Sequence, residues 1–295
     1  MNQLLPRIAP ALFVLLWSTG FIASKLGGPY AEPATFLSVR FLIVLAILVP
    51  VALLFSAPWP TGWPAIHSIV VGALIHGAYL GGVFWAIRNG LPAGVSALIV
   101  SLQPVLTAVL AATLLGERIT PRHWGGLALG LLGAALVVGS KIELAEHARG
   151  TGITVATVCS CGVALLGMTI GTIYQKRFST KADLRTGTAL QFIGALVVTA
   201  PLALVVETRE IEWSAPFMAA LAWLVIVLSI VSIMLLMFLI RQNAVSRLSG
   251  LFYLVPAVTA GLAFLMFGET LTLVQLTGVA MVMGAVVLID PVGTK

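Results

Sequence analysis

Ten long apolar runs, separated by short polar connections, account for nearly the whole chain. The runs are continuous rather than alternating in polarity, and continuous runs of this length indicate helices rather than half-buried strands. A helix needs about 20 apolar residues to cross about 30 Å of hydrocarbon, and each run is close to that length. We therefore expect an all-α integral membrane protein with ten transmembrane helices. The expected spans are residues 8–26, 34–55, 66–87, 93–115, 123–139, 151–174, 184–206, 216–240, 247–267 and 272–289.

The composition agrees with a membrane-embedded chain. Apolar residues make up 60% of it, charged residues only 9%, and the mean hydropathy is +1.10. A soluble domain carries roughly 25% charged residues. The first run follows Arg7 and stays apolar to Leu26 without a cleavage site of small residues, so we expect a retained span rather than a signal peptide.

Positive charges predict the orientation of the chain in the membrane. With a cytoplasmic N-terminus, ten Lys and Arg residues fall in cytoplasmic segments and five in segments on the other side. In membrane proteins the short cytoplasmic loops carry the excess of Lys and Arg. Both termini are therefore expected in the cytoplasm, and the net charge of +6 needs no nucleic acid partner to explain it.

The second half of the chain repeats the first. Eight residues of the fourth span and the loop after it recur, in order, 152 positions later. They are Pro104, Thr107, Ala108, Leu110, Ala111, Gly116, Glu117 and Thr120, which recur as Pro256, Thr259, Ala260, Leu262, Ala263, Gly268, Glu269 and Thr272. Further matches at offsets of 151 and 153, such as Phe41 with Phe192 and Arg88 with Arg241, extend the repeat over nearly the whole chain. Because five spans are an odd number, the halves, residues 1–145 and 146–295, are expected to be inverted repeats that cross the bilayer in opposite directions.

Several short motifs occur in the same order as in a known family. They are Trp17-Ser18-x-x-Phe21 in the first span, Arg40-Phe41 in the second, and the two Pro-x-x-Thr…Gly-Glu segments that end the fourth and ninth spans. With these motifs the chain resembles the drug/metabolite transporter superfamily, specifically its ten-helix EamA-like branch. The resemblance implies a transport unit of the bacterial inner membrane, monomeric or weakly dimeric, with a central cavity that opens alternately to each side. It also implies export of small organic metabolites such as amino acids, and the chain is most similar to exporters of aromatic amino acids.

Polar and aromatic side chains within the apolar runs are the candidate substrate-binding residues, because such groups tend to face the bundle interior or a wet cavity. The candidates are Trp17, His76, Tyr79, Gln103, Thr169 and Tyr253. His76 and Tyr79 are three residues apart and share a helix face. Each candidate also has a structural interpretation. His76 and the tyrosines would pack and bond a neighbouring helix, and Thr169 would bond the carbonyl four residues earlier.

Three further groups have a predicted role. Pro104 and Pro256 are expected to free a backbone carbonyl in mid-span, where it would serve a ligand or a hinge. Arg40 in the second span is expected to reach the interface or to pair with a carbonyl, and a bond to a substrate carboxylate is the alternative. Glu207, Glu210 and Glu212 are interpreted as solvated residues of an outer loop.

The distribution of titratable groups bears on energy coupling. No Asp or Glu lies in the middle of any expected span, so the usual carboxylate for carrying a proton or Na⁺ is absent there. His76 is the only central side chain that gains and loses a proton near neutral pH. The expected mechanism is facilitated transport, or coupling to protons through His76.

Other classes of protein fit the sequence less well. Cys159 and Cys161 lie two apart on a helix and face different directions, so neither a metal site nor a disulfide is expected. Motifs for phosphate binding or hydrolysis are absent, and we expect no cofactor. A membrane-embedded enzyme that uses His76 and Arg40, a channel, and an exporter of drugs or other metabolites are the alternatives. An enzyme or a channel leaves the inverted duplication unexplained, whereas alternating access around a site shared by both halves accounts for it.

Overall fold

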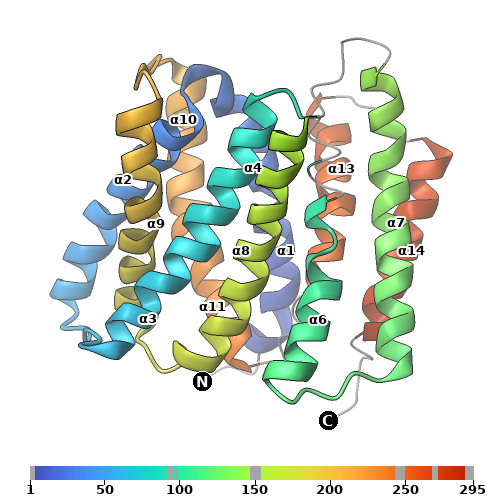
Figure 1. Ribbon diagram of the computed structural model, residues 1–295, viewed down its shortest axis with the longest axis horizontal. Helices are drawn as coiled ribbons and strands as arrows, with labels where there is room; N and C mark the ends of the chain where they lie inside the picture. The colour runs from blue at the N-terminus through green and yellow to red at the C-terminus, as the bar shows by residue number, and fades with distance from the viewer. Residues whose placement is uncertain are drawn as a thin grey trace.

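A computed structural model describes residues 4–91, 96, 99–146, 154–242, 250–267 and 272–289. Within these ranges the chain forms ten helical rods that run side by side across one bundle (Figure 1). The only pairing of strand type among the described residues is an isolated bridge between Ala31 and Ile211. The prediction of an all-α fold with ten helices is confirmed.

Each half contributes five rods, of which the third is built from three segments. The first half contains α1 (Leu4–Gly27), a 3-10 turn (Gly28–Tyr30), α2 (Pro33–Leu54), α3 (Trp63–Gly72), the π-helical segment η2 (Ala73–Ala78), α4 (Tyr79–Arg88), α6 (Gln103–Leu114) and α7 (Pro121–Glu146). The second half contains α8 (Val155–Phe178), α9 (Leu184–Val206), α10 (Ala215–Trp223), the π-helical segment η3 (Leu224–Ser232), α11 (Ile233–Gln242), the 3-10 turn η4 (Leu251–Tyr253), α13 (Leu254–Phe267) and α14 (Leu273–Ile289).

Most helix ends lie within a few residues of the predicted ends. The helix α7 extends to Glu146, beyond the predicted end at residue 139, and two other ends differ for local reasons. The sixth rod begins at Val155 because Thr154 and Thr157 form a reciprocal cap. The Thr154 hydroxyl accepts a hydrogen bond from the Thr157 backbone N–H (3.2 Å), and the Thr157 hydroxyl accepts one from the Thr154 N–H (3.0 Å). In the fourth rod the long helix α6 begins only at Gln103, after a turn, so the expected helix over 93–115 is shorter in its described part.

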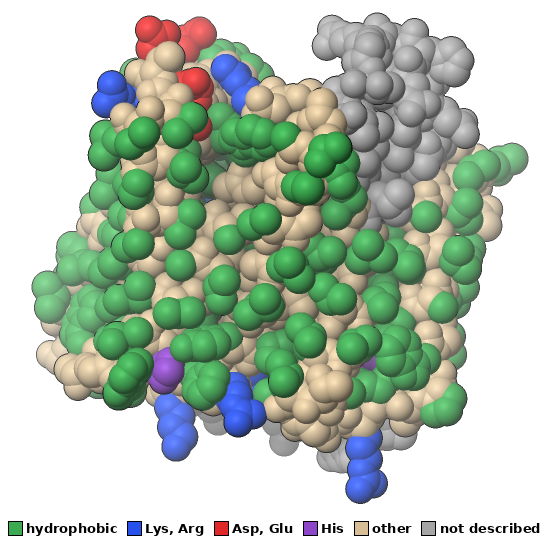
Figure 2. Space-filling model, viewed as in Figure 1, with side chains coloured by type: hydrophobic (Ala, Val, Ile, Leu, Met, Phe, Trp, Pro, Cys, Tyr) green, Lys and Arg blue, Asp and Glu red, His purple; other side chains and the backbone are tan. Residues whose placement is uncertain are grey.

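The surface of the bundle is that of a membrane protein. Five described stretches are long and apolar enough to cross a bilayer: Pro33–Leu54, Trp63–Arg88, Val155–Phe178, Leu184–Val206 and Ala215–Gln242. Large apolar side chains are exposed around the middle of the bundle, and Figure 2 shows them as a broad apolar belt. In that view one end carries acidic side chains together with Lys and Arg, and the other end carries Lys and Arg with no acidic side chain in sight. Exposed apolar area of this extent is stable only against lipid.

The two halves pack against each other through equivalent helices. The second helices, α2 and α9, lie side by side, and so do the fifth helices, α7 and α14. The third rod of each half packs on the first helix of the other, α4 on α8 and α10 on α1. The fourth helices behave likewise, α6 against α8 and α13 against α1. Since α1 begins at the end of the bundle at which α8 finishes, the halves run in opposite directions (Figure 1).

The crossing of α3 and α9 depends on two glycines. A Cβ atom added to Gly72 would lie 1.7 Å from the backbone oxygen of Gln191, and one added to Gly194 would lie 1.9 Å from that of Ile69. Both distances are far below van der Waals contact, so no larger residue fits while the helices remain in place. Close approach through small residues is a common way to pack helices in membranes. Here it brings the third rod of the first half against the second helix of the second half.

Both third rods widen into a π-helical segment at equivalent positions. In the first half the segment covers Ala73–Ala78, and in the second half it covers Leu224–Ser232. π-helical turns are rare and are frequently found at functional sites. The segments therefore direct attention to the side chains that they carry, among which are His76 and Ser229.

Candidate functional site: paired bridges at the centre and unlike ends

Two polar bridges connect the halves at the π-helical segments. The Arg40 Nε of α2 donates to the Ser229 hydroxyl of η3 at 2.7 Å. The His76 Nε2 of η2 lies 3.3 Å from the Gln191 Oε1 of α9 and donates to it when that nitrogen carries the proton. Gln191 follows Arg40 by 151 residues, and Ser229 follows His76 by 153, so the second bridge is the repeat of the first. Each bridge joins the second helix of one half to the third rod of the other.

An aromatic pair lies between the bridges. The rings of Phe41 and Phe192, themselves repeat equivalents, have centroids 5.3 Å apart. The His76 ring stacks on Phe192 with a centroid distance of 4.9 Å and an interplanar angle of 18°, and the Arg40 guanidinium carbon lies 5.9 Å from the centroid of Phe41. All four side chains are buried. The centre of the bundle is thus a packed cluster of two cation-capable groups and two rings.

Trp17, His76 and Tyr79 lie within one large buried cluster. Trp17 is 9% exposed and packs against Phe13 (5.2 Å between centroids) and edge-on against Phe252 (5.7 Å). Tyr79 begins α4 directly after the π-helical segment and is 6% exposed. The structure therefore brings these three candidates into the interior, as expected of residues that are not lipid-facing.

Thr169 on α8 is fully buried, and its hydroxyl donates to the Leu165 backbone oxygen at 2.7 Å. Thr172 does the same to Met168, also at 2.7 Å. This is the back-bonded geometry of the structural interpretation, in which a threonine satisfies its hydroxyl within its own helix.

Gln103 is a candidate with an unsatisfied acceptor. It is 2% exposed at the start of α6, and its Nε2 donates to the Thr107 hydroxyl at 2.9 Å. Its Oε1 has no hydrogen-bond partner, and neither do the hydroxyls of Ser232 and Thr259. A buried acceptor without a partner costs about 1–3 kcal/mol, so each of these atoms requires an explanation.

Tyr253 lies apart from the other candidates. It is fully buried between the fourth and fifth helices, where its hydroxyl donates to the Leu127 backbone oxygen at 3.2 Å. A Cβ atom added to Gly130 would lie 2.6 Å from its ring, so the ring fills the space that this glycine leaves. The geometry is that of the packing interpretation, in which a buried tyrosine satisfies its hydroxyl on a neighbouring helix.

The two prolines are found near the beginnings of helices rather than within continuous ones. Pro104 is the second residue of α6, after a turn at residues 101–102, and Pro256 is the third residue of α13, after the 3-10 turn η4. A proline in the first turn of a helix replaces an N–H that would have no partner within the helix. We expected each proline to free a carbonyl within a continuous helix. The structure instead has a break in the rod just before each proline.

Two carboxylates tie the halves together at the end of the bundle where α2 begins and α9 finishes. Glu207 accepts hydrogen bonds from the backbone N–H groups of Ala34 (2.8 Å) and Thr35 (2.7 Å) and from the Thr35 hydroxyl (2.7 Å). Glu32 in turn accepts from the Thr208 N–H (2.6 Å) and hydroxyl (2.7 Å). We call this pair of glutamates the latch, and its end of the bundle the latch end.

The latch corrects one interpretation of the sequence. Glu207 is not simply a solvated loop residue, because it caps the N-terminus of α2, which lies more than 170 positions earlier in the sequence. Carboxylates at helix N-termini are stabilised both by the free N–H groups and by the helix dipole. Hydrogen bonds to Glu32, led by that from the Thr208 side chain, hold the pKa of this carboxyl below its ordinary value. Glu210 and Glu212 are exposed, in agreement with the loop interpretation for those two residues.

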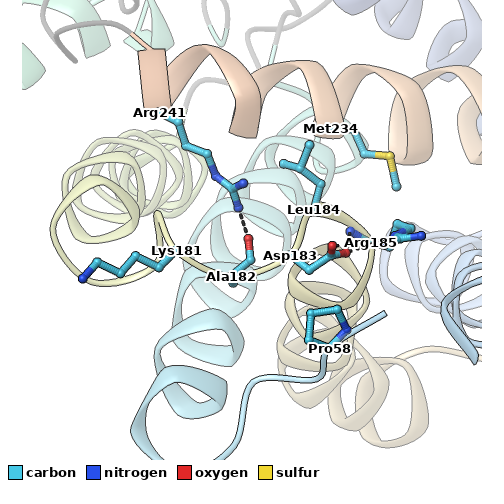
Figure 3. Close-up of a pocket in the computed structure, with 8 residues that line it drawn as sticks. All are labelled: Pro58, Lys181, Ala182, Asp183, Leu184, Arg185, Met234 and Arg241. Carbon is cyan, nitrogen blue, oxygen red and sulfur yellow. Dashed lines mark hydrogen bonds and ion pairs between the residues drawn. The ribbon is translucent and has the colours of Figure 1, made fainter. Parts of the chain in front are cut away.

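A hollow of about 580 Å³ opens at the opposite end, where α1 begins and α14 finishes, which we call the termini end (Figure 3). Its lining consists of Pro58, Lys181, Ala182, Asp183, Leu184, Arg185, Met234 and Arg241. The Arg185 guanidinium pairs with Asp183 at 3.1 Å, and these hydrogen bonds hold the pKa of the Asp183 carboxyl below its ordinary value. Arg241 donates to the Ala182 backbone oxygen. None of the predicted site residues lines this hollow.

A methionine on α11 contacts the residues that lead from the hollow to the central bridges. Met237 lies on α11 between Met234 and Arg241, nearer the termini end than Met234, and its sulfur accepts from the Thr188 hydroxyl at 3.0 Å and from the Gln191 Nε2 at 3.8 Å. Thr188 and Gln191 follow Leu184 at helical spacings of four and three, so they continue the same face of α9 inward. Methionine is flexible and adapts its shape easily.

Sequence reasoning missed Gln191 and Ser229 as parts of the centre. The sequence contained a signal for both residues. The match of Phe41 with Phe192 makes Gln191 the repeat equivalent of Arg40, and the offset of 153 in the third rods makes Ser229 the repeat equivalent of His76. For Glu207 no comparable signal exists in the sequence, because its partners lie in a different half of the chain. Among the described residues, no group of three or more His, Cys, Asp or Glu side chains is placed to hold a metal ion.

Comparison with known proteins identifies the type of molecule. The model of the EamA-like transporter family matches this chain twice, over residues 8–139 and 155–289. The chain is 27% identical to the uncharacterized transporter YvbV of Bacillus subtilis, over 95% of this chain and 90% of that protein. It is 25% identical to the uncharacterized inner membrane transporter YedA of Escherichia coli, over 98% of this chain and 92% of that protein.

Two further comparisons bear on function and fold. A probable amino-acid metabolite efflux pump of Salmonella typhimurium is 24% identical over 92% of this chain and 90% of its own length. A crystal structure of a protein superimposes with a TM-score of 0.79, at 20% sequence identity, over 95% of this chain and 97% of that chain. The latter similarity shows the fold alone. The family and the named relatives are transporters and efflux pumps, and not enzymes.

Proposed function

Because the chain belongs to the EamA-like transporter family, we propose that it exports small organic metabolites, specifically amino acids, by alternating access. A relative named as a probable amino-acid metabolite efflux pump supports this substrate class and this direction. The buried aromatic side chains Trp17, Phe41 and Phe192 support aromatic amino acids among them. The other exported metabolites of such carriers, drugs included, are the alternative substrates.

The observation that carries the proposal is the pairing of contacts between two inverted halves. Every major contact between the halves has an equivalent, and the central bridges Arg40–Ser229 and His76–Gln191 repeat the pattern at the level of single side chains. A carrier of this kind alternates because one half adopts the conformation of the other, which opens the opposite end of the bundle. The latch at one end and the hollow at the other correspond to one of two such states.

The proposed orientation places the termini end in the cytoplasm of a bacterial cell, with the chain in the inner membrane. Lys and Arg side chains project from that end with no acidic side chain in view, whereas the other end carries both signs (Figure 2), and cytoplasmic loops carry the excess of Lys and Arg. In this orientation the hollow faces the cytoplasm and the latch closes the outer end. Residues 1–145 and 146–295 form the two halves of one transport unit, a monomer or a weak dimer, that binds a small molecule and is embedded in lipid.

The proposed substrate-binding residues are those that approach the centre from both halves. Trp17, His76, Tyr79, Gln103 and Thr169 remain candidates, and the unpaired Oε1 of Gln103 supports a role in accepting a hydrogen bond from a substrate. Tyr253 keeps its proposed place, although its hydroxyl already has a partner in Leu127. Pro104 and Pro256 mark the proposed hinges, since each begins a helix after a break in its rod.

Flux through the purified protein in liposomes tests the proposal. Labelled phenylalanine, tryptophan and tyrosine are offered first, followed by aliphatic amino acids, and saturable flux that an excess of unlabelled substrate on the far side accelerates is expected for at least one. Saturation together with counterflow distinguishes a carrier from a channel. Absence of saturable flux for every amino acid would contradict the proposed substrate class.

The same liposomes test energy coupling. We expect a pH gradient to change the flux of wild-type protein and to change it less in His76→Ala, because imidazole is the side chain whose ordinary pKa lies nearest neutral pH. Gln191→Ala is the matched control, since it breaks the same bridge and leaves the imidazole in place. An equal response to the gradient in wild type and His76→Ala would exclude His76 as the coupling residue.

A further inference from the structure

We propose that Arg40 binds the carboxylate of the transported solute, so that the substrates are carboxylate-bearing molecules and their decarboxylated amines are discriminated against. This inference rests on the proposed transport function and adds the chemical group that is recognised. It begins from the burial of Arg40, which is 6% exposed in the interior of a membrane-spanning helix. Arginine stays protonated at any physiological pH, and a buried charge is expensive unless a counter-charge lies beside it.

This chain supplies no counter-charge to Arg40 among its described residues. The side-chain contacts of Arg40 in the structure are the Nε bond to Ser229 and the ring of Phe41. The acidic residue nearest in sequence is Glu32, about 12 Å away along the helix at 1.5 Å per residue, and its carboxylate is bonded to Thr208 and Arg209. The two terminal guanidinium nitrogens of Arg40 are therefore the donors that remain for a ligand.

The duplication provides an internal control for what the bridge itself requires. At the equivalent position of the second half the residue is Gln191, which is neutral and nevertheless joins α9 to the third rod through His76. A bridge of this kind thus forms without a charge. The bridge from α2 to the third rod therefore does not need the positive charge of Arg40. The two terminal nitrogens of a guanidinium match the two oxygens of a carboxylate.

The route to Arg40 carries the complementary sign. The hollow at the termini end is lined by Lys181, Arg185 and Arg241 against the single acid Asp183, so it attracts anions (Figure 3). From Leu184 in its wall, the face of α9 leads inward past Thr188 to Gln191, which contacts both Met237 and His76. His76 stacks on Phe192, which pairs with Phe41 beneath the Arg40 guanidinium. An amphipathic acid that enters there meets aromatic rings and one buried cation.

The test compares Arg40→Gln, which copies the residue of the second half, with wild type and with Arg122→Gln, the same change at an exposed arginine. Thermal unfolding of the purified proteins is followed with increasing concentrations of matched probes: phenylalanine against phenethylamine, tryptophan against tryptamine, and leucine against isoamylamine. We expect carboxylate probes to raise the melting temperature of wild type and of Arg122→Gln. In Arg40→Gln the carboxylate concentration that gives half of the maximal rise in melting temperature should increase at least about tenfold. The response of the melting temperature to the amines should stay the same as in wild type. Arg40→Lys should fall between, because it keeps the charge and loses the fork.

A second readout needs no ligand. Without any probe, Arg40→Gln should melt at the same temperature as wild type or higher, since an uncompensated buried charge has been replaced by the residue that serves the equivalent bridge. A large drop in melting temperature, or failure to assemble, would assign Arg40 a structural role and overturn the inference. Undiminished preference for carboxylates in Arg40→Gln would overturn it as well, and so would a wild type that no carboxylate stabilises. Saturable flux in liposomes of an amine, or of a solute without a carboxylate, would then show that the transport function stands without this recognition.

Discussion

The two ends of the bundle are built from equivalent parts and are held differently. At the latch end, the beginning of α2 is bound by Glu207, and Glu32 reaches across to Thr208. At the termini end, the equivalent of Glu32 is Asp183, which instead caps its own helix through the Arg185 N–H (2.9 Å), and the equivalent of Glu207 is Ser56. There the beginning of α9 is bound to the first half by the Thr186 hydroxyl, which donates to the Pro58 oxygen at 2.8 Å.

This difference accounts for which end is closed. Hydrogen bonds to ionised acceptors are roughly twice as strong as those between neutral groups. At the latch end several of them hold the start of α2 to the second half, whereas the start of α9 is held to the first half by the neutral bond from Thr186 beside the hollow. Elsewhere at the termini end, among the described residues, the Arg177 guanidinium donates to the Leu114 oxygen at 2.9 Å and the Ser68 and Ser179 hydroxyls lie 3.0 Å apart. Two copies of one unit therefore give unlike ends because a few polar residues changed, while the helices that carry them stayed alike. The sequence difference between copies is where the preferred state is encoded.

Removal of the central acceptor of the latch should have the largest effect. Glu207→Ala leaves the N–H groups of Ala34 and Thr35 and the Thr35 hydroxyl without their acceptor, which we expect to destabilise the closed end by about 2–3 kcal/mol. Reactivity of Ser38→Cys, one turn below the latch, toward an impermeant maleimide measures the opening in a background without Cys159 and Cys161. Glu210→Ala is the control, since Glu210 lies in the same loop and is exposed. Equal labelling in the two variants would show that the latch does not hold this end.

Two equivalent threonines, Thr35 at the latch end and Thr186 at the termini end, allow a direct comparison of the two ends, with a smaller expected effect than that of Glu207→Ala. Thr35 donates to an ionised carboxylate and Thr186 to a backbone carbonyl, although the two residues are repeat equivalents. We expect Thr35→Val to lower the free energy of unfolding by about 1.5–3 kcal/mol and Thr186→Val by about 0.5–1.5 kcal/mol. Denaturation of both variants in the same detergent measures the difference. If Thr186→Val proved the more destabilising, the termini end would be the more tightly held one.

The smallest effect on stability is expected from protonation of Glu32 at low pH. The pKa of Glu32 is lower in the folded protein than its ordinary value of 4.5, so its contribution to the latch is complete at neutral pH and is lost as the pH falls through the folded-state value. Glu32→Gln should therefore be less stable than wild type at pH 7, and the difference should shrink below about pH 4.5. Melting curves of both proteins between pH 7 and pH 3 measure it. A difference that stays constant over this range would mean that the ionised form of Glu32 is not what the latch uses.

The sequence predicted the fold better than it predicted the centre. Length and continuity of the apolar runs were sufficient for ten helices, because in hydrocarbon the backbone has few other ways to satisfy its hydrogen bonds. The offset of 151 to 153 residues was sufficient for the inverted repeat. The π-helical widening of the third rods was not foreseen, because periodicity does not distinguish a π turn from an α turn over six to nine residues.

The candidate site was predicted only in part, and the reasons are physical. Trp17, His76 and Tyr79 were placed in the interior because polar and aromatic groups avoid the middle of a lipid-facing surface. Tyr253 is equally buried, yet it faces Leu127 of α7, which follows from helix packing and has no trace in local sequence. The partners of Arg40 and Glu207 are set by tertiary contacts between the halves, which composition and spacing do not specify.

The widened turn of the third rods also carries information on ancestry. Both copies have it at equivalent places, and one origin before the gene duplication is a simpler history than two separate origins after it. The ancestral five-helix polypeptide then already possessed this turn. Such a polypeptide would have inserted in both orientations and assembled as an antiparallel homodimer, in which one phenylalanine met its own symmetry mate where Phe41 now meets Phe192. Within one chain the two copies can differ at any position, as Arg40 and its equivalent Gln191 do.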